Sequence, residues 1–489
     1  MPDLCDLSAA EALSRLRSRE ISPVDLVESC LARIAAVNPA VNAVVALDAE
    51  GARAAAREAE AAIRRGDRLG PLHGLPVAIK DLDETAGLRT TFGSLLYENH
   101  VPREDGGIAA SVRAAGGIIL GKTNTPEWGL GANTRNAVYG ATGNPFDPQK
   151  SCAGSSGGAA VALATGMVPL ATGSDMAGSL RTPAAFCGVV GFRPTAGLVP
   201  AEKRVLGWSP LSVLGPMART VGDTALLLSV LARKDPRDPL SVAPPPLFPL
   251  PAVDLAKVRA AATEDFGLAP VERIIREAFR ARADACRGWF ASVEAAHPDC
   301  TGADESFATL RAAQVVAAHA ERVRERPDRC GPNLHANVAE GLALSLADQA
   351  QAHAVQTRIF RAFERFFRDR DVLLAPAAAI TPRSWRELYP AEIDGAPTRN
   401  YFHWLAVAYC VTLVGYPAVS LPVGRDAAGM PFGLQIVGRP GSDAQLLGIA
   451  AALERQFAAD EHTRRPEPDL ENLRRAPPIA RAEGFLGWS

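Results

Sequence analysis

The sequence lacks an excess of charge of either sign, a long apolar run and a basic leader. Its 489 residues carry 52 Lys and Arg against 54 Asp and Glu, a formal net charge of −2. Such a balance offers no basic surface for phosphate backbones, so a nucleic-acid partner is not expected. No stretch has the length and continuous apolarity of a membrane span, and the first residues include Asp3 and Asp6 instead of a basic patch. We therefore expect a cytoplasmic protein with no membrane partner.

Cysteine and histidine are present, but not in metal-binding patterns. Eight cysteines are spread from Cys5 to Cys410 without a C-x-x-C pair, and the eight histidines show neither H-E-x-x-H nor zinc-finger spacing. We interpret the cysteines as free thiols in the core, where small residues are commonly Cys. Cys152 and Cys187 lie near the motifs described below and are assigned no chemical role. No metal and no other cofactor is expected.

Strand-like and helical segments alternate in both terminal parts of the chain. Ser22-Pro23-Val24-Asp25 has the residues of a helix start, and apolar residues follow at helical spacing as far as Ile34. A second helix is predicted from about Asp48 to Arg65. Short apolar runs predict strands at 75–80, 117–120, 371–376, 418–423 and 432–437. A small-residue helix is predicted at 159–165, and the alternation as a whole predicts an α/β fold.

The middle of the chain has a different pattern. Prolines crowd into 243–251, which can be neither a helix nor a central strand, and residues 268–370 are mostly typical of amphipathic helices. The sequence shows no internal repeat. We predict one domain over 1–489, with a variable and mainly helical segment at about 235–370 and a sheet completed from both ends of the chain.

Three segments place reactive side chains among glycines or at a strand end. They are Leu75–Asp81, which contains Lys80, the Ser/Gly run Ala153–Gly158, and Gly173–Arg181. Glycine allows close backbone approach, which suits a loop whose amide hydrogens converge on a developing negative charge. Each segment alone has a simpler interpretation, since a Ser/Gly run is typical of a flexible loop and a strand-end lysine usually reaches solvent.

Together these segments resemble the amidase-signature family, whose hallmark is a Lys, then G-S-S-G-G, then a G-S-D motif that ends in G-S-[IL]-R. The resemblance covers most of residues 5–235 and 371–455. It includes further segments at 120–127, 143–145, 188–195, 215–219, 417–422 and 433–438. It implies an α/β/α sandwich around a mixed, largely parallel β-sheet, and an enzyme that hydrolyses carboxamide C–N bonds.

The resemblance also assigns the catalytic residues: Ser179 as nucleophile, Ser155 as proton relay and Lys80 as base. They are 75 and 24 residues apart along the chain, in the order Lys80, Ser155, Ser179. A serine hydroxyl needs a base to accept its proton as it attacks an amide. Lys80 can be that base only when neutral, and burial in an apolar strand lowers a lysine pKa. The resemblance further implies a cis peptide bond before Ser155.

The loop before the nucleophile is expected to form the oxyanion hole. Its donors would be the backbone N–H groups of Met176, Ala177 and Gly178, with that of the nucleophile itself. Many family members have Gly where Ala177 stands, and we interpret this departure as a feature of specificity. Asp175 and Arg181 are expected to support the loop through hydrogen bonds and charge pairing, although a solvated surface pair would also explain them.

Two other motifs match by pattern alone. Residues 116–123 satisfy the phosphate-binding pattern G-x-x-x-x-G-K-T, but a β-branched strand replaces the open loop, and 124–126 cannot continue as the required helix. Residues 154–158 satisfy G-x-S-x-G, the elbow of His-dependent esterases, with Ser156 as the nucleophile. No apolar strand precedes that motif, because 145–150 is typical of a turn.

The substrate is encoded outside the shared motifs. Trp128, the aromatic run Tyr401–Trp404 and the helical segment are expected to line an apolar acyl site, although core packing explains these aromatics equally well. This favours an apolar aryl or medium aliphatic amide over a small charged one, with esters as further substrates. The alternative is a glutaminase-type A subunit of a tRNA-dependent amidotransferase, which works with partner chains. The sequence leaves the oligomeric state open, and a homodimer is the prior expectation.

Overall fold

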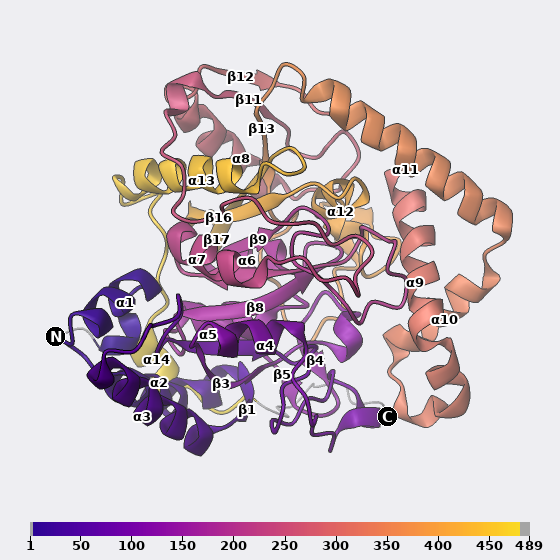
Figure 1. The fold of residues 1–489 in the computed structure, drawn as a ribbon. Coiled ribbons are helices and arrows are strands. Elements are labelled where there is room, and N and C mark those ends of the chain that lie inside the picture. Colours follow the sequence, from indigo (N-terminus) through magenta and orange to yellow (C-terminus); the bar gives the residue numbers. More distant parts are fainter. Residues whose placement is uncertain (1–2, 480–489) are drawn as a thin grey trace.

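The computed structural model describes residues 3–479, which are built around one large mixed sheet (Figure 1). From edge to edge, its strands are β1 (Val44–Leu47), β3 (Ile118–Thr123), β2 (Pro76–Lys80), β8 (Leu170–Asp175), β10 (Val213–Ala218), β9 (Val190–Arg193), β16 (Ala418–Arg425), β17 (Pro431–Val437), β13 (Val372–Pro376), β11 (Arg259–Ala262) and β12 (Ser292–Ala295). Strands β3, β2 and β8 run parallel, as do β13, β11 and β12, and the pairings between these two blocks are antiparallel. The α/β class with a mixed sheet is confirmed.

Short two-stranded pairs lie outside this sheet. They are β4 (Arg135–Asn136) with β5 (Gly140–Ala141), β6 (Gly143–Asn144) with β7 (Asp147–Ser151), and β14 (Glu392–Ile393) with β15 (Ala396–Pro397).

Helices cover the sheet and complete the α/β/α sandwich. They are α1 (Ala9–Arg17), α2 (Pro23–Val41), α3 (Ala49–Arg65), α4 (Gly107–Ala114), α5 (Gly157–Ala164), α6 (Arg181–Cys187), α7 (Val221–Leu231), α8 (Arg273–Cys286), α9 (Ala303–Glu325), α10 (Pro332–Ala343), α11 (Leu346–Phe366), α12 (Ala406–Leu413), α13 (Asp443–Ala458) and α14 (Leu470–Arg475). Helices α5 and α6 contact each other and pack on β8, β9, β16 and β17, whereas α7 packs on β10 and contacts α4 and α13. Figure 1 shows α9, α10 and α11 together along one side of the molecule.

The two predicted N-terminal helices are confirmed together with their caps. The Ser22 hydroxyl accepts a hydrogen bond from Asp25 N at 3.0 Å, and the Asp25 carboxylate accepts one from Ser22 N, so α2 begins with a full capping box. The Asp48 carboxylate likewise accepts from Gly51 N at 2.9 Å and begins α3. In both helices the short polar side chain satisfies a backbone donor that has no partner inside the helix.

Several strands differ from the prediction. Strand β3 continues past Leu120 to Thr123, because the Lys122 ammonium is buried among hydrogen-bond acceptors and does not end the strand in solvent. Strands β8, β9 and β10 were not predicted from the sequence, and β11 and β12 lie inside the segment expected to be helical. These last two have only four residues each, and β11 is Ala-rich, so neither has a clear period of two. The sheet is therefore completed from the middle of the chain as well as from its ends.

Among residues 3–479, no helix combines the length and the apolarity that crossing a membrane would require. The cytoplasmic location and the single domain stay predictions.

Candidate active site

Lys80, the last residue of β2, has its ammonium group fully buried between three serine hydroxyls. Its Nζ lies 2.7 Å from Ser155 Oγ, 2.9 Å from Ser156 Oγ and 3.0 Å from Ser174 Oγ. Burial lowers the pKa of Lys80 from 10.5 to about 7, against the opposing charges of Asp83 and Asp175. A lysine with such a pKa is available as a neutral base near neutral pH.

Ser155 lies in the turn that begins α5. The Gly154–Ser155 peptide bond is cis, as the family resemblance implied, and the Ser155 side chain is buried. The glycines around it permit close backbone contacts: a Cβ added at Gly158 would lie 2.3 Å from the backbone nitrogen of Asn124. The turn is joined to the next motif, because Ser156 N donates to Ser179 O at 3.2 Å.

Ser179 is half-buried in the loop between β8 and α6, and Asp175 organises that loop from inside. The Asp175 carboxylate accepts hydrogen bonds from Gly178 N at 2.9 Å and Leu180 N at 3.2 Å. It also forms an ion pair with the guanidinium of Arg181 at 2.9 Å, and the side chains of both Asp175 and Arg181 are buried. The loop is therefore tied to a buried ion pair. Asp175 and Arg181 are not the solvated surface pair that the sequence left open.

The charge of Asp175 is stabilised by two arginines. Burial alone would raise the pKa of Asp175, but Arg181 and Arg193 outweigh that effect and hold the pKa well below its usual range. Arg193 Nη1 lies 3.2 Å from Asp175 Oδ1. Arg181 continues inward to Gln435 Oε1 at 2.6 Å and Ala408 O at 3.0 Å, which connects the loop to β17 and α12. Such a network holds the loop in place, because movement of the carboxylate or of a guanidinium group would leave a buried charge without its counter-charge.

The backbone donors next to Ser179 are not equivalent. Gly178 N is engaged with Asp175, whereas Met176 N, Ala177 N and Ser179 N donate to no acceptor within residues 3–479. These three N–H groups are the ones free to stabilise a developing negative charge. Gly178 has a φ of +103°, and a Cβ there would lie 2.7 Å from the Ala408 side chain. Ala177 does not have a positive φ, so its methyl group adds no backbone strain.

A cavity of about 450 Å³, which we call the aromatic pocket, is lined by neighbours of the site residues, although Lys80, Ser155 and Ser179 themselves do not line it. Its wall includes Leu82, two residues after Lys80, and Leu214, which pairs across the sheet with Ser174. A Cβ added at Gly129 would lie 3.3 Å from Ser155 Oγ and 3.1 Å from Leu82 Cδ1, so this turn borders both Ser155 and the pocket wall. The pocket is of the size and character expected for a small-molecule site.

Aromatic rings form one wall of this pocket. Phe92 stacks on Trp128 with ring centres 4.7 Å apart, and Tyr97 meets Trp128 edge-on at 5.4 Å. Trp128 was expected to line the acyl site. The run Tyr401–Trp404 was also expected there, but it does not line this pocket: Trp404 is buried and packs near Phe186. Phe402 and Trp404 belong to the core, as the simpler interpretation held, whereas Tyr401 is half-buried and its hydroxyl accepts a hydrogen bond from Arg311.

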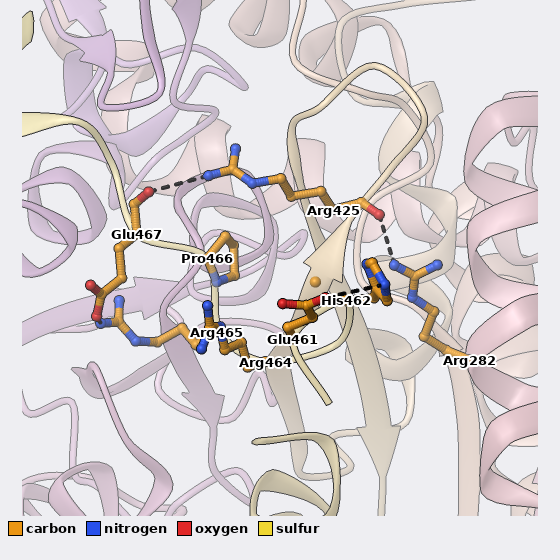
Figure 2. A pocket seen from close by; sticks show the side chains of 9 residues that line it. Arg282, Arg425, Glu461, His462, Arg464, Arg465, Pro466 and Glu467 are labelled. Carbon is orange, nitrogen blue, oxygen red and sulfur yellow. Dashed lines mark hydrogen bonds and ion pairs between the residues drawn. The ribbon is translucent and has the colours of Figure 1, made fainter. Parts of the chain in front are cut away.

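A second cavity, of about 710 Å³, lies at the end of β16, and its lining includes four arginines (Figure 2). Its guanidinium groups are largely occupied by the protein itself. Arg282 donates to Arg425 O at 2.7 Å, Arg425 to Glu467 O at 3.2 Å, and Arg465 to Glu467 Oε1 at 2.6 Å. Neither a lysine nor a serine lines this cavity. The arrangement around Lys80 is therefore the candidate active site.

The two rival motifs lack the geometry that their chemistry needs. Residues 118–123 form β3, and Lys122 Nζ is held by Thr85 Oγ1 at 3.0 Å and Thr90 Oγ1 at 3.2 Å, so it cannot reach a phosphate. Ser156 is fully buried, and its hydroxyl lies between Lys80 and the backbone of Ser174. The strand before that motif, β7, is polar. No nucleotide site or esterase elbow is formed.

Two polar contributors were missed in the sequence. Ser174 supplies the third hydroxyl around Lys80, and Arg193 supplies the second charge on Asp175. The available signal for Ser174 was its place in the G-S-D motif, one residue before Asp175. Arg193 comes from a strand that the sequence analysis did not predict.

Comparison with known proteins identifies the family of the chain. The family model described as Amidase matches residues 25–447. An acylamidase of Rhodococcus erythropolis is 35% identical, over 92% of this chain and 95% of its own length. The A subunit of the glutamyl-tRNA(Gln) amidotransferase of Anaeromyxobacter sp. (strain K) is also 35% identical, over 93% and 97%. The crystal structure of a bacterial aryl acylamidase of the amidase signature family superimposes with a TM-score of 0.86 at 29% identity, covering 93% of this chain and 98% of that one. The chain belongs to the amidase family and is an amidase-signature hydrolase.

Proposed function

We propose that the protein hydrolyses small apolar aryl or aliphatic amides, and esters, through an acyl-enzyme on Ser179, with Ser155 relaying protons to Lys80. The observation that carries this proposal is the buried Lys80 amine, 2.7 Å from Ser155 Oγ, in a site where burial lowers its pKa to about 7. A lysine in this state accepts a proton through a serine, as in other Ser-Lys hydrolases.

The reaction would proceed in two halves. Ser179 Oγ attacks the amide carbon while its proton passes to Ser155 and the Ser155 proton passes to Lys80. The free N–H groups of the nucleophile loop would stabilise the oxyanion, and each such donor typically contributes about 10²–10³-fold in rate. Lys80 then returns a proton through Ser155 to the leaving nitrogen as the C–N bond breaks. Water repeats the attack on the acyl-enzyme and releases the acid, so these steps require no metal or cofactor.

The aromatic pocket supports an apolar substrate. The Trp128 and Phe92 rings offer a flat apolar wall, and Gly129, the residue after Trp128, borders Ser155. Such a wall suits an aryl or alkyl group better than a short polar side chain. Similarity to an acylamidase and to an aryl acylamidase supports the same class. The amidotransferase component is an equally similar relative, so glutamine belongs in the test.

The test is a hydrolysis panel of acetanilide, benzamide, hexanamide, the matching ethyl esters and glutamine. We expect turnover of the apolar amides that is lost in Ser179→Ala and falls at least about 100-fold in Lys80→Ala. Ser14→Ala and Lys257→Ala change exposed residues of the same types and should keep wild-type turnover. Ammonia release from glutamine without hydrolysis of any apolar amide would instead favour a role in an amidotransferase.

A further inference from the structure

Asp83, three residues after Lys80, places a carboxylate without a hydrogen bond in the wall of the aromatic pocket. Neither carboxylate oxygen accepts a hydrogen bond from residues 3–479, and Oδ2 is closed to solvent. The hydrogen bonds of Asp83 are made by its main chain: its N–H donates to Lys80 O at 3.0 Å, and its carbonyl accepts from Lys122 Nζ and from Thr85 Oγ1 at 3.3 Å. Asp83 is half-buried, and its closed atom is Oδ2. Buried polar atoms are nearly always paired, so this unpaired oxygen in a cavity wall indicates a missing donor.

The other two carboxylates of the pocket already have partners. Glu84 forms an ion pair with Lys203, and Glu202 accepts a hydrogen bond from Gly107 N at 2.7 Å. Both groups are therefore satisfied by the protein itself. Asp83 differs from them in having no such partner.

The basic groups of the pocket are compensated as well. Arg322 lies over the Trp128 ring, 4.9 Å from its centre, and donates to Ala318 O. Arg204 has Nε and Nη2 without a hydrogen bond, but the Asp238 carboxylate lies 3.9 Å from its Nη2. The Asp83 carboxylate is thus the charged group of the pocket that has no partner at hydrogen-bonding or ion-pair distance within residues 3–479.

We propose that Asp83 is a specificity residue that binds the ammonium group of an amide substrate whose apolar body lies against the aromatic wall. This rests on the proposed function. An ammonium group supplies the donors that Asp83 lacks, and a charge-assisted hydrogen bond is the strong kind. The amide of such a substrate would face Ser179 while its amino group faces Asp83.

Asp83 is an anion at pH 8, because its pKa is about 6. Burial raises this pKa from its ordinary value and the charge of Glu202 adds to the rise, whereas Lys122, Lys80 and Lys203 limit it. The ionised carboxylate in turn raises the pKa of Lys80. An ammonium group bound at Asp83 would cancel this effect, so amine-bearing substrates should be hydrolysed with an acid limb at lower pH than neutral ones.

The test compares matched amides that differ only in one terminal group. The pairs are 6-aminohexanamide with heptanamide, and 4-(aminomethyl)benzamide with 4-ethylbenzamide, and 4-(carboxymethyl)benzamide serves as the anionic counterpart. Calorimetric binding to full-length Ser179→Ala at pH 8 should favour each amine over its neutral partner by about 10- to 100-fold. Asp83→Asn in the same background should reduce this preference to about 3-fold or less. Glu84→Gln, which changes a paired carboxylate of the same pocket, should retain the preference.

A second measurement does not depend on the folding of any Asp83 variant. In Ser179→Ala, the preference for the amines should fall about tenfold between pH 8 and pH 5, where about 90% of Asp83 is protonated. An amine preference that survives Asp83→Asn or is as large at pH 5 as at pH 8, no preference at all, or preference for the carboxymethyl compound would overturn the proposal. Turnover by the wild-type protein separates the two claims: absence of amide hydrolysis contradicts the proposed function, whereas the binding ratios decide the role of Asp83.

Discussion

The pH dependence of the reaction should report the buried state of Lys80. Its pKa falls from 10.5 to about 7, which corresponds to about 5 kcal/mol against the protonated form. Turnover needs the neutral amine, so kcat/KM for a neutral amide should rise with pH. The neutral fraction should be about 10% at pH 6 and about 90% at pH 8, a rise of roughly tenfold, and then reach a plateau.

The assay is kcat/KM for 4-ethylbenzamide from pH 5.5 to 9.5, corrected for stability at each pH. An unperturbed lysine would give a rate that still increases tenfold per pH unit at pH 9, and that result would refute the argument from burial. Asp83→Asn offers an internal check. Removing this negative charge should shift the acid limb to lower pH, since Asp83 raises the pKa of Lys80.

The same pKa shift has a consequence for stability. Because the folded-state pKa of Lys80 lies below its unfolded value, its burial destabilises the fold fully below pH 7, less between pH 7 and 10.5, and not above that. Lys80→Met removes this penalty. The free energy of unfolding of Lys80→Met minus that of wild type should therefore be about 3 kcal/mol larger at pH 6 than at pH 9, meaning that the substitution stabilises the fold more at pH 6. Packing effects that do not depend on pH cancel from this difference. Equal differences at the two pH values would contradict the shift.

Three further substitutions test other parts of the site. Asp175→Asn leaves two buried arginines without their counter-charge and should lower the free energy of unfolding by about 3–5 kcal/mol in urea titrations; a variant as stable as wild type would refute the role of that network. Gly158→Ala places a Cβ 2.3 Å from Asn124 N and should destabilise the fold by at least about 1–3 kcal/mol, whereas Gly222→Ala, with open space around it, should not. Trp128→Leu should raise KM for benzamide more than for hexanamide, and equal effects on both would argue against an aryl contact at this ring.

The sequence predicted the site better than it predicted the sheet. Lys80, Ser155 and Asp175 could be placed because their motifs match a family pattern whose spacing reflects one arrangement in space. The structure brings Lys80 to Ser155 directly and connects Ser179 to the same turn through Ser156 N. The catalytic roles themselves stay predictions.

What the sequence could not predict depends on contacts distant along the chain. Strands β11 and β12 are too short for their periodicity to be visible, and β11 pairs with β13, which lies more than 100 residues further along the chain. The Gly178 N–H group was expected to help stabilise the oxyanion, and only the structure shows that Asp175 engages it. Likewise, only the structure shows that Glu84 and Glu202 find partners in distant segments while the Asp83 carboxylate does not.

The most direct test of the central claim is to identify the nucleophile. The purified full-length protein would be treated with a fluorophosphonate, and the adduct located by mass spectrometry in wild type, Ser179→Ala, Lys80→Ala and the exposed control Lys257→Ala. We predict a single adduct on Ser179, absent from Ser179→Ala, formed at least about 100-fold more slowly in Lys80→Ala and unchanged in Lys257→Ala. An adduct on Ser156, or no adduct on protein that hydrolyses amides, would contradict the account.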